Sequence, residues 1–195
     1  RGLDKIRFSA KNGLTIGALA TWTQLLESEA VSSHYPLLRK ASESMGSVQI
    51  RNMATLAGNI CHASPAANGP IPLLLYDAVC LVQGIKEERI IPVGKLFAGV
   101  QKTSLKHDEI VTEIRLPLPP AGARGSFHKF AQRKAMELPM VAVGTLCRTS
   151  DGAWAEVRLA LGAVAKKPFR AQKTEKFLLK KTSDEKNLRL GAEMA

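Results

Sequence analysis

Small residues and short hydrogen-bonding side chains are concentrated between residues 49 and 65. Thr55 and Asn59 could donate or accept hydrogen bonds with a phosphate or a ribose, and the small Ala57 and Gly58 between them would let the backbone approach a ligand closely. Successive backbone N–H groups in such a loop can form a concavity that binds anions. The stretch therefore suits a phosphate-binding loop, although its composition suits a structural loop with tight turns equally well.

Two further side chains of this segment, Cys61 and His62, could in principle be reactive. A thiolate beside an imidazole can act as a nucleophile, and the same two groups can bind a metal ion. Consecutive residues rarely face each other, however, and no further ligand types cluster nearby in the sequence. We therefore expect neither a nucleophile nor a metal site here, and we expect His34, His107 and His128 on the surface or in loops.

The chain has 195 residues, of which 45% are hydrophobic, and this is enough for one or two domains with a proper core. No apolar run approaches the roughly 20 residues that span a bilayer, and the start shows no signal-peptide pattern. The three cysteines are far apart and odd in number, which argues for a reducing compartment. We expect a cytoplasmic protein, and the lack of a Cys-x-x-Cys pair predicts that it holds no iron–sulfur cluster of its own.

The net charge of +11 is compatible with several kinds of partner. A solvated basic surface, an anionic ligand, an acidic partner subunit and a nucleic acid all remain open. Aromatic residues make up only 5% of the chain and no nucleic-acid-binding module is recognisable, so nucleic acid is the least favoured of these. The basic tail over residues 166–189 has the pattern of an amphipathic helix that packs on a sheet or docks to a partner.

The elements on both sides must position the segment of residues 49–65. Before it, alternation, the turn signal Asn12-Gly13 and the capping residues predict a hairpin and two helices. The strands cover residues 5–8 and 14–18, and the helices run from Thr21 or Thr23 to about residue 29 and from Pro36 to about residue 45. After it, we expect a short helix over residues 70–77 and strands over residues 79–82, 89–93 and 109–116.

The proline- and glycine-rich residues 117–125 indicate a boundary between two subdomains. Beyond them the pattern is that of antiparallel strands followed by helices, and Asp151-Gly152 supplies a hairpin turn. The strands are predicted over residues 127–133, 140–148 and 154–164, and the helices over residues 171–179 and from 183 to the end. The chain therefore belongs to the α+β class.

The motifs between residues 49 and 78 resemble those of one family. Gln-Ile-Arg-Asn-x-Ala-Thr-x-x-Gly-Asn-Ile, then Ala63-Ser64-Pro65, Pro72-Leu73-Leu74 and Asp77-Ala78, are similar to the FAD-binding subunit of the molybdenum hydroxylases. This family contains xanthine dehydrogenase, aldehyde oxidase and carbon monoxide dehydrogenase. The likeness extends from Leu14 to about Arg170 and is strongest with the separate FAD subunit of bacterial xanthine dehydrogenases.

The resemblance implies an α+β chain in two parts. Residues 1–120 would form the second subdomain of a PCMH-type FAD-binding domain. Residues 121–195 would form a C-terminal antiparallel sheet with helices, similar to the C-terminal domain of the carbon monoxide dehydrogenase flavoprotein. The first FAD subdomain, whose glycine-rich loop also contacts the FAD pyrophosphate, would be missing, and the end within helix-like sequence suggests a truncated C-terminal domain.

The resemblance also implies a second pyrophosphate loop, formed by Thr55, Leu56, Ala57, Gly58 and Asn59. The hydroxyl of Thr55 would bond a phosphate oxygen, and Ala57 and Gly58 would present backbone N–H groups. Asn59 would bond a phosphate or the ribityl chain. Many relatives have Gly-Gly-Asn here, and the alanine of this chain fits only if its φ is negative.

Three more cofactor-binding residues, Asn68, Val111 and Lys129, are implied by the resemblance. Asn68 replaces an aspartate that would hold ribose hydroxyls, and its amide oxygen can still accept, without charge assistance. Val111 would lie beside the cofactor. Lys129 would lie near the flavin ring, where a cation stabilises the anionic reduced form. Cys61, which follows the loop, would pack near the same ring. A plain turn at Asn68, a core position for Val111 and a solvated Lys129 are the structural alternatives.

By resemblance, the protein binds FAD and transfers electrons within a molybdopterin-dependent hydroxylase, without catalytic residues of its own. A molybdopterin-binding large subunit would hydroxylate the substrate. A small subunit with [2Fe–2S] clusters would pass the electrons to FAD, and NAD or another acceptor would receive them. Two alternatives remain open: a cofactor-free assembly module of the same complex, and a basic nucleic-acid-binding protein.

Overall fold

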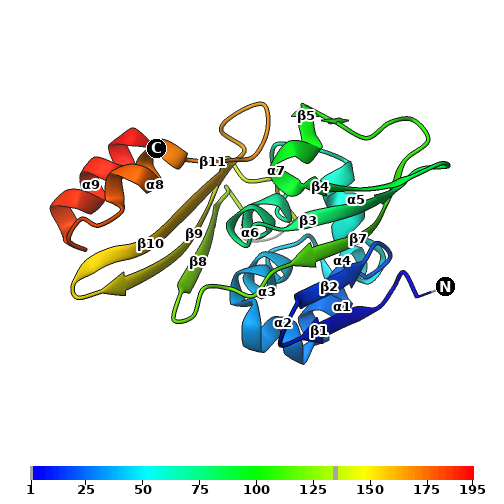
Figure 1. The fold of residues 1–195 in the computed structure, drawn as a ribbon. Helices are drawn as coiled ribbons and strands as arrows, with labels where there is room; N and C mark the ends of the chain where they lie inside the picture. The colour runs from blue at the N-terminus through cyan, green and yellow to red at the C-terminus, as the bar shows by residue number, and fades with distance from the viewer. Residues whose placement is uncertain (1, 134–135) are drawn as a thin grey trace.

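The computed structural model describes residues 2–133 and 136–195. Within them, the strands form two large antiparallel sheets and a small two-stranded one, with helices packed between and beside the large sheets (Figure 1). The chain ends beside its two last helices, next to the four-stranded sheet (Figure 1). In this described part of the chain, no helix has the length and apolar character needed to cross a membrane.

The five-stranded sheet has the order β1-β2-β7-β3-β4, and all neighbouring strands are antiparallel. Its strands are β1 (Ile6–Ser9), β2 (Gly13–Gly17), β7 (Ile110–Leu116), β3 (Val79–Gln83) and β4 (Glu88–Pro92). Leu14, Ile16, Ile114 and Leu116 are all fully buried and alternate along their strands. This period of two places one face of the sheet on the core, as the sequence pattern predicts.

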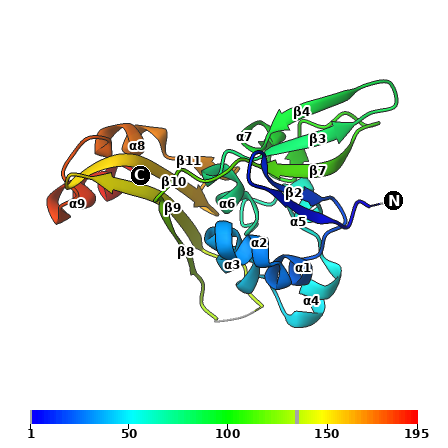
Figure 2. The same ribbon diagram turned by 60° about the horizontal axis from the view of Figure 1, so that its bottom comes forward.

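Short helices cover this sheet, and Figure 2 shows four of them together, α1, α2, α3 and α4. They are α1 (Trp22–Glu27), α2 (Glu29–His34), α3 (Pro36–Glu43) and α4 (Val48–Met53), followed by α5 (Leu56–Cys61) and α6 (Pro70–Leu75). Thr21 caps α1 in a capping box with Gln24. The helix predicted to about residue 29 is α1, which ends at Ser28; α2, which Ser28 caps, was not predicted.

The segment of residues 49–65, expected to be a loop, contains most of α4 and all of α5. Ser47 caps α4 by accepting from the N–H of Ile50, and Thr55 caps α5 by accepting from the N–H of Gly58. The side chains of Leu56 and Ile60 are fully buried beneath α5. Packing of these two residues on the core therefore holds the segment in helical turns that its small residues alone did not predict.

The four-stranded sheet has the order β11-β10-β9-β8 and is also antiparallel. Its strands are β8 (Arg124–Phe130), β9 (Val141–Ser150), β10 (Ala153–Gly162) and β11 (Phe169–Arg170), and α8 (Gln172–Leu178) and α9 (Glu185–Met194) follow. Asp151 and Gly152 both have positive φ, 52° and 75°, as the predicted hairpin turn requires. Short pieces such as β11, α7 (Val93–Leu96), β5 (Phe97–Gly99) and β6 (Lys102–Thr103) were not predicted, because they are too short to show a period.

Helices α3 and α6 lie between the two sheets and contact both parts of the molecule (Figure 1). Two glycines of the four-stranded sheet make this packing possible. A Cβ at Gly144 would lie 2.5 Å from Cγ2 of Ile71 in α6, and a Cβ at Gly125 would lie 2.5 Å from Cγ of Leu37 in α3. The absence of a side chain at these positions lets the helices approach the strands closely.

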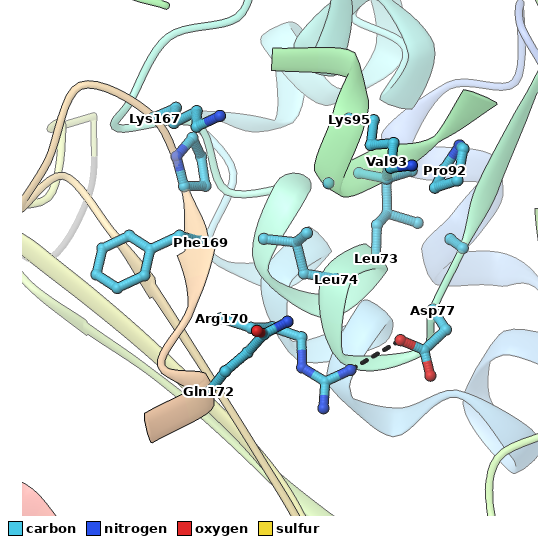
Figure 3. Close-up of a pocket in the computed structure, with 13 residues that line it drawn as sticks. Leu73, Leu74, Asp77, Pro92, Val93, Lys95, Lys167, Phe169, Arg170 and Gln172 are labelled. Atoms are coloured by element: carbon cyan, nitrogen blue, oxygen red, sulfur yellow. Dashed lines mark hydrogen bonds and ion pairs between the residues drawn. The ribbon is translucent and has the colours of Figure 1, made fainter. Parts of the chain in front are cut away.

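An ion-pair network also joins α6 to the second sheet. Asp77 follows α6 and has a positive φ of 51°. Its carboxylate accepts from Nη1 of Arg170 at 2.8 Å, as Figure 3 shows, and from Nη1 of Arg158 at 2.6 Å. Arg158 Nη1 also donates to the carbonyl oxygen of Leu75 at 2.7 Å, so both arginines tie the end of α6 to β10 and β11.

Candidate functional site

A cavity of about 410 Å³ lies where the two parts of the molecule meet beside α5. Asn59 enters it from α5, Asn68 from the loop before α6, and Lys129 from β8 of the second sheet. The cavity thus brings together three of the residues predicted for the cofactor site. Its volume falls in the range of about 300–1,000 Å³ that is usual for small-molecule sites.

Asn68 is held in the cavity wall with one polar atom unused. Its side chain is 4% exposed, and Nδ2 donates to the carbonyl oxygen of Ser44 at 3.2 Å and to Ser44 Oγ at 3.1 Å. Among the described residues, nothing donates to Oδ1 of Asn68. Because Asn68 lines the cavity, this oxygen can accept from the hydroxyl of a ligand bound there. The two bonds to Ser44 make Asn68 more than a plain turn residue.

In Asn59, unlike Asn68, the carboxamide oxygen is paired within the protein. Its Oδ1 accepts from the backbone N–H of Gly69 at 3.0 Å, which ties the loop before α6 to α5. A Cβ at Gly69 would lie 2.8 Å from this oxygen, so the contact depends on the glycine. No described residue accepts from the carboxamide N–H₂ group of Asn59, which lines the cavity and can donate to a ligand there.

The other residues of the predicted loop lie at the start of α5 and do not line this cavity. Thr55 Oγ1 accepts from the N–H of Gly58 at 3.0 Å, so that N–H serves the helix cap. The hydroxyl proton of Thr55 can still be donated outward. Leu56 and Ala57 bury their side chains, while their backbone N–H groups, in the first turn, have no acceptor within the helix. Ala57 lies within α5 and has a negative φ, which is what an alanine requires at this position.

Lys129 places a positive charge in the wall of the cavity. Its ammonium group donates to the carbonyl oxygen of Glu137. Partial burial lowers the pKa of Lys129, and the nearby carboxylate of Glu137 opposes this change. Lys129 is therefore a partly desolvated cation held by backbone, rather than a freely solvated lysine.

Val111 and Cys61 are not brought to the cavity. Val111 is buried in β7, where it pairs with Val82 of β3. This is the core position that the sequence allowed as an alternative to cofactor binding. Cys61 packs against the same core, and burial raises the pKa of its thiol, which makes it a poor nucleophile. His62 lines the cavity. The sequence had suggested no cofactor-binding role for this histidine.

Several residues of the cavity were not found from the sequence. Ser44 orients Asn68, and Met45, Ile50 and Leu138 add apolar surface. Gln101 reaches the cavity from the turn between β5 and β6, where its N–H donates to the carbonyl oxygen of Ala63 at 3.0 Å. These residues come from α4 and from separate loops and show no common motif, so only the folded chain identifies them.

Comparison with known proteins gives a consistent result. The family described as the FAD binding domain in molybdopterin dehydrogenase matches residues 1–119, and the CO dehydrogenase flavoprotein C-terminal domain matches residues 126–195. The chain is 37% identical to a xanthine dehydrogenase FAD-binding subunit of Escherichia coli O157:H7, over 89% of this chain and 60% of that protein. It therefore spans about 60% of the length of such curated relatives.

Solved structures show the same relationship. A carbon monoxide dehydrogenase from Hydrogenophaga pseudoflava superimposes with a TM-score of 0.94 at 28% identity, covering 99% of this chain and 67% of that one. Quinoline 2-oxidoreductase from Pseudomonas putida 86 superimposes with a TM-score of 0.91 at 26% identity, covering 98% and 66%. The expected fold is thereby confirmed.

The cavity fits part of an FAD molecule. The unused oxygen of Asn68 suits a ribose hydroxyl, the carboxamide N–H₂ group of Asn59 suits a phosphate or hydroxyl oxygen, and the ammonium of Lys129 suits negative charge. Apolar side chains complete the wall, as a flavin or an adenine requires. The matches over both halves show that the chain belongs to the FAD-binding medium subunits of the molybdenum hydroxylase family.

Proposed function

We propose that this protein is the electron-transferring FAD subunit of a molybdopterin-dependent hydroxylase of the xanthine dehydrogenase type. The observation that carries the proposal is the cavity beside α5, which collects Asn59, Asn68 and Lys129 in a chain whose first 119 residues match the FAD-binding family. When bound, FAD supplies the electron-accepting and electron-donating chemistry that no side chain of the protein possesses.

The chain's own residues bind and orient this cofactor. Asn68 Oδ1 accepts from a ribose hydroxyl, and Ser44 holds the carboxamide in the orientation that this requires. The hydroxyl of Thr55 and the N–H₂ group of Asn59 donate to phosphate oxygens. Lys129, fixed by the carbonyl oxygen of Glu137, favours negative charge on the ring system when it is reduced.

The remainder of the complex follows from the same proposal. A large subunit with the molybdopterin hydroxylates the substrate, a small subunit with [2Fe–2S] clusters delivers electrons, and NAD or another acceptor removes them. The description of relatives as medium chains or FAD subunits supports such an assembly. Residues 1–120 then hold the cofactor and residues 121–195 form the C-terminal domain, in a complex that operates in the reducing cytoplasm.

The test is to purify the chain together with the subunits encoded by its flanking reading frames. We expect the denatured complex to release FAD, the bound flavin to be reduced when the substrate of the large subunit is added, and the flavin content to fall in the Asn68→Leu variant. A complex that assembles with its iron–sulfur clusters but releases no FAD, and cannot be reconstituted with added FAD, would show that the chain is a cofactor-free assembly module instead.

A further inference from the structure

A second cavity, of about 430 Å³, lies where α6, α7 and the loop before β11 meet (Figure 3). Leu74 lines it from α6, Val93 and Lys95 line it from α7, and Lys167 lines it from the loop between β10 and β11. None of its lining residues belongs to the cavity beside α5. Both parts of the molecule therefore build a cavity to which the proposed electron transfer assigns no role.

Two of the charged groups in its wall, Asp77 and Arg170, are balanced within the protein. The carboxylate of Asp77 accepts from Nη1 of Arg170 at 2.8 Å and from Nη1 of Arg158 at 2.6 Å. Arg170 also donates to the two carboxylate oxygens of Glu175, at 2.8 and 2.9 Å. Each of these groups has a partner of opposite charge, so neither Asp77 nor Arg170 requires a ligand as its counterion.

Two lysines of the same wall have no partner of this kind. Among the described residues, neither Lys95 nor Lys167 forms an ion pair with a carboxylate. The ammonium group of Lys167 donates to the carbonyl oxygen of Phe97 in β5 at 3.4 Å, and this contact leaves its charge uncompensated. Two uncompensated positive charges in the wall of one cavity attract an anion.

Apolar side chains form much of the remaining wall. Leu74 and Val93 are 7% and 1% exposed, and Pro168 is also buried. Gly94 leaves the space in front of Leu74 open, since an added Cβ would lie 3.4 Å from Cδ2 of that leucine. A wall of this kind favours a ligand whose body is apolar.

We propose that this cavity binds a small carboxylate with an apolar ring, such as benzoate. Its ring packs on Leu74 and Val93, and its carboxylate faces Lys95 and Lys167, whose ammonium groups donate charge-assisted hydrogen bonds. An inorganic anion would leave the apolar wall without contacts, and a neutral ring would leave both ammonium charges uncompensated. The proposal does not depend on the binding of FAD in the other cavity.

The experiment is a calorimetric titration of the full chain with three probes, each with and without saturating FAD. Benzoate carries a ring and a charge, benzyl alcohol carries the ring alone, and acetate carries the charge alone. We expect benzoate to bind about tenfold more tightly than either of the others, because only benzoate uses both kinds of wall. Its affinity should fall as the salt concentration rises from about 0.05 to about 0.5 M, since salt screens exposed charges, while that of benzyl alcohol stays constant.

Substitutions in the two kinds of wall give a second readout. Lys95→Met and Lys167→Met should each weaken benzoate binding about two- to fivefold, which is the size of effect typical of exposed ion pairs. Lys173→Met is the matched control, because it removes the same charge from an exposed lysine of α8 that does not line the cavity. Gly94→Leu should fill the space in front of Leu74 and weaken benzoate and benzyl alcohol alike. If Gly94→Leu does not fold, the two lysine variants and the three probes decide the question.

Several results would overturn the proposal. Benzoate that does not saturate the chain, or that binds no more tightly than benzyl alcohol or acetate, would show that charge and ring are not recognised together. The same conclusion follows if the double variant of Lys95 and Lys167 binds benzoate unchanged, or if Lys173→Met weakens it equally. Benzoate that FAD displaces would be bound in the cavity beside α5 instead.

Discussion

Replacement of Asn68 by leucine removes both functions of this side chain at nearly constant volume. The oxygen that accepts no bond in the protein is lost, and so are the two bonds from Nδ2 to Ser44, of 3.2 and 3.1 Å. One neutral hydrogen bond to the cofactor amounts to about 0.5–1.5 kcal/mol. We therefore expect Asn68→Leu to bind FAD roughly three- to tenfold more weakly.

The same substitution also affects folding, and the two effects can be separated. Loss of the bonds to Ser44 leaves a carbonyl oxygen and a hydroxyl without their donor, so the free energy of unfolding should fall by about 1–3 kcal/mol. Ser44→Ala removes the Oγ that accepts from Asn68 and donates to the carbonyl oxygen of Ala41 at 2.8 Å, and it leaves Oδ1 of Asn68 in place. It should also lower stability, but FAD affinity should change less than in Asn68→Leu.

Asn68→Asp is the informative companion variant. Aspartate retains an acceptor for the ribose and adds charge assistance, so FAD affinity should equal or exceed that of the wild type. Stability should fall, because a carboxylate oxygen would face the carbonyl oxygen of Ser44 in place of a donor. Affinities come from flavin fluorescence quenching at several FAD concentrations, and stabilities from urea unfolding of the same samples.

The result that would refute this reasoning is specific. If Asn68→Leu is folded and binds FAD as tightly as the wild type, Oδ1 of Asn68 does not contact the cofactor. The cavity would then have been assigned to the wrong ligand or to the wrong part of it.

Three further substitutions test other parts of the structure. Gly58→Val places a Cβ 2.9 Å from Oγ1 of Thr55. This should disrupt the cap of α5, lower the free energy of unfolding by about 1 kcal/mol and reduce the amount of bound flavin. Unchanged flavin content would contradict the loop assignment. Gly144→Val places a Cβ 2.5 Å from Ile71, and the overpacking should cost about 1–3 kcal/mol in thermal or urea unfolding. The hydrogen bonds from Arg89 and Lys106 lower the pKa of Glu109 to about 2. The ionised Glu109 side chain therefore stabilises the fold fully above the ordinary carboxyl pKa of about 4.3, and this stabilisation is lost as the pH falls toward 2. Glu109→Gln should therefore flatten the acid limb of the stability profile, and an unchanged profile would show that this ion pair does not contribute.

The sequence by itself determined the features that depend on local chemistry. Alternation over β9 and β10, joined by Asp151-Gly152, indicated a hairpin, because the period of two and the turn residues act between near neighbours. Pro36 indicated the start of α3 for the same reason. The order of motifs around residues 49–78 was sufficient to identify the family, since it depends only on residue types and spacing.

Only the tertiary structure decided the form of the segment of residues 49–65 and the composition of the cavity. Helices of six residues are marginal alone, and α5 exists because Leu56 and Ile60 are buried against the core. Asn68 is oriented by Ser44, and Lys129 arrives from another sheet. Val111 belongs to the core instead. These arrangements result from contacts between residues far apart in the chain, and such contacts leave no periodic pattern in the sequence.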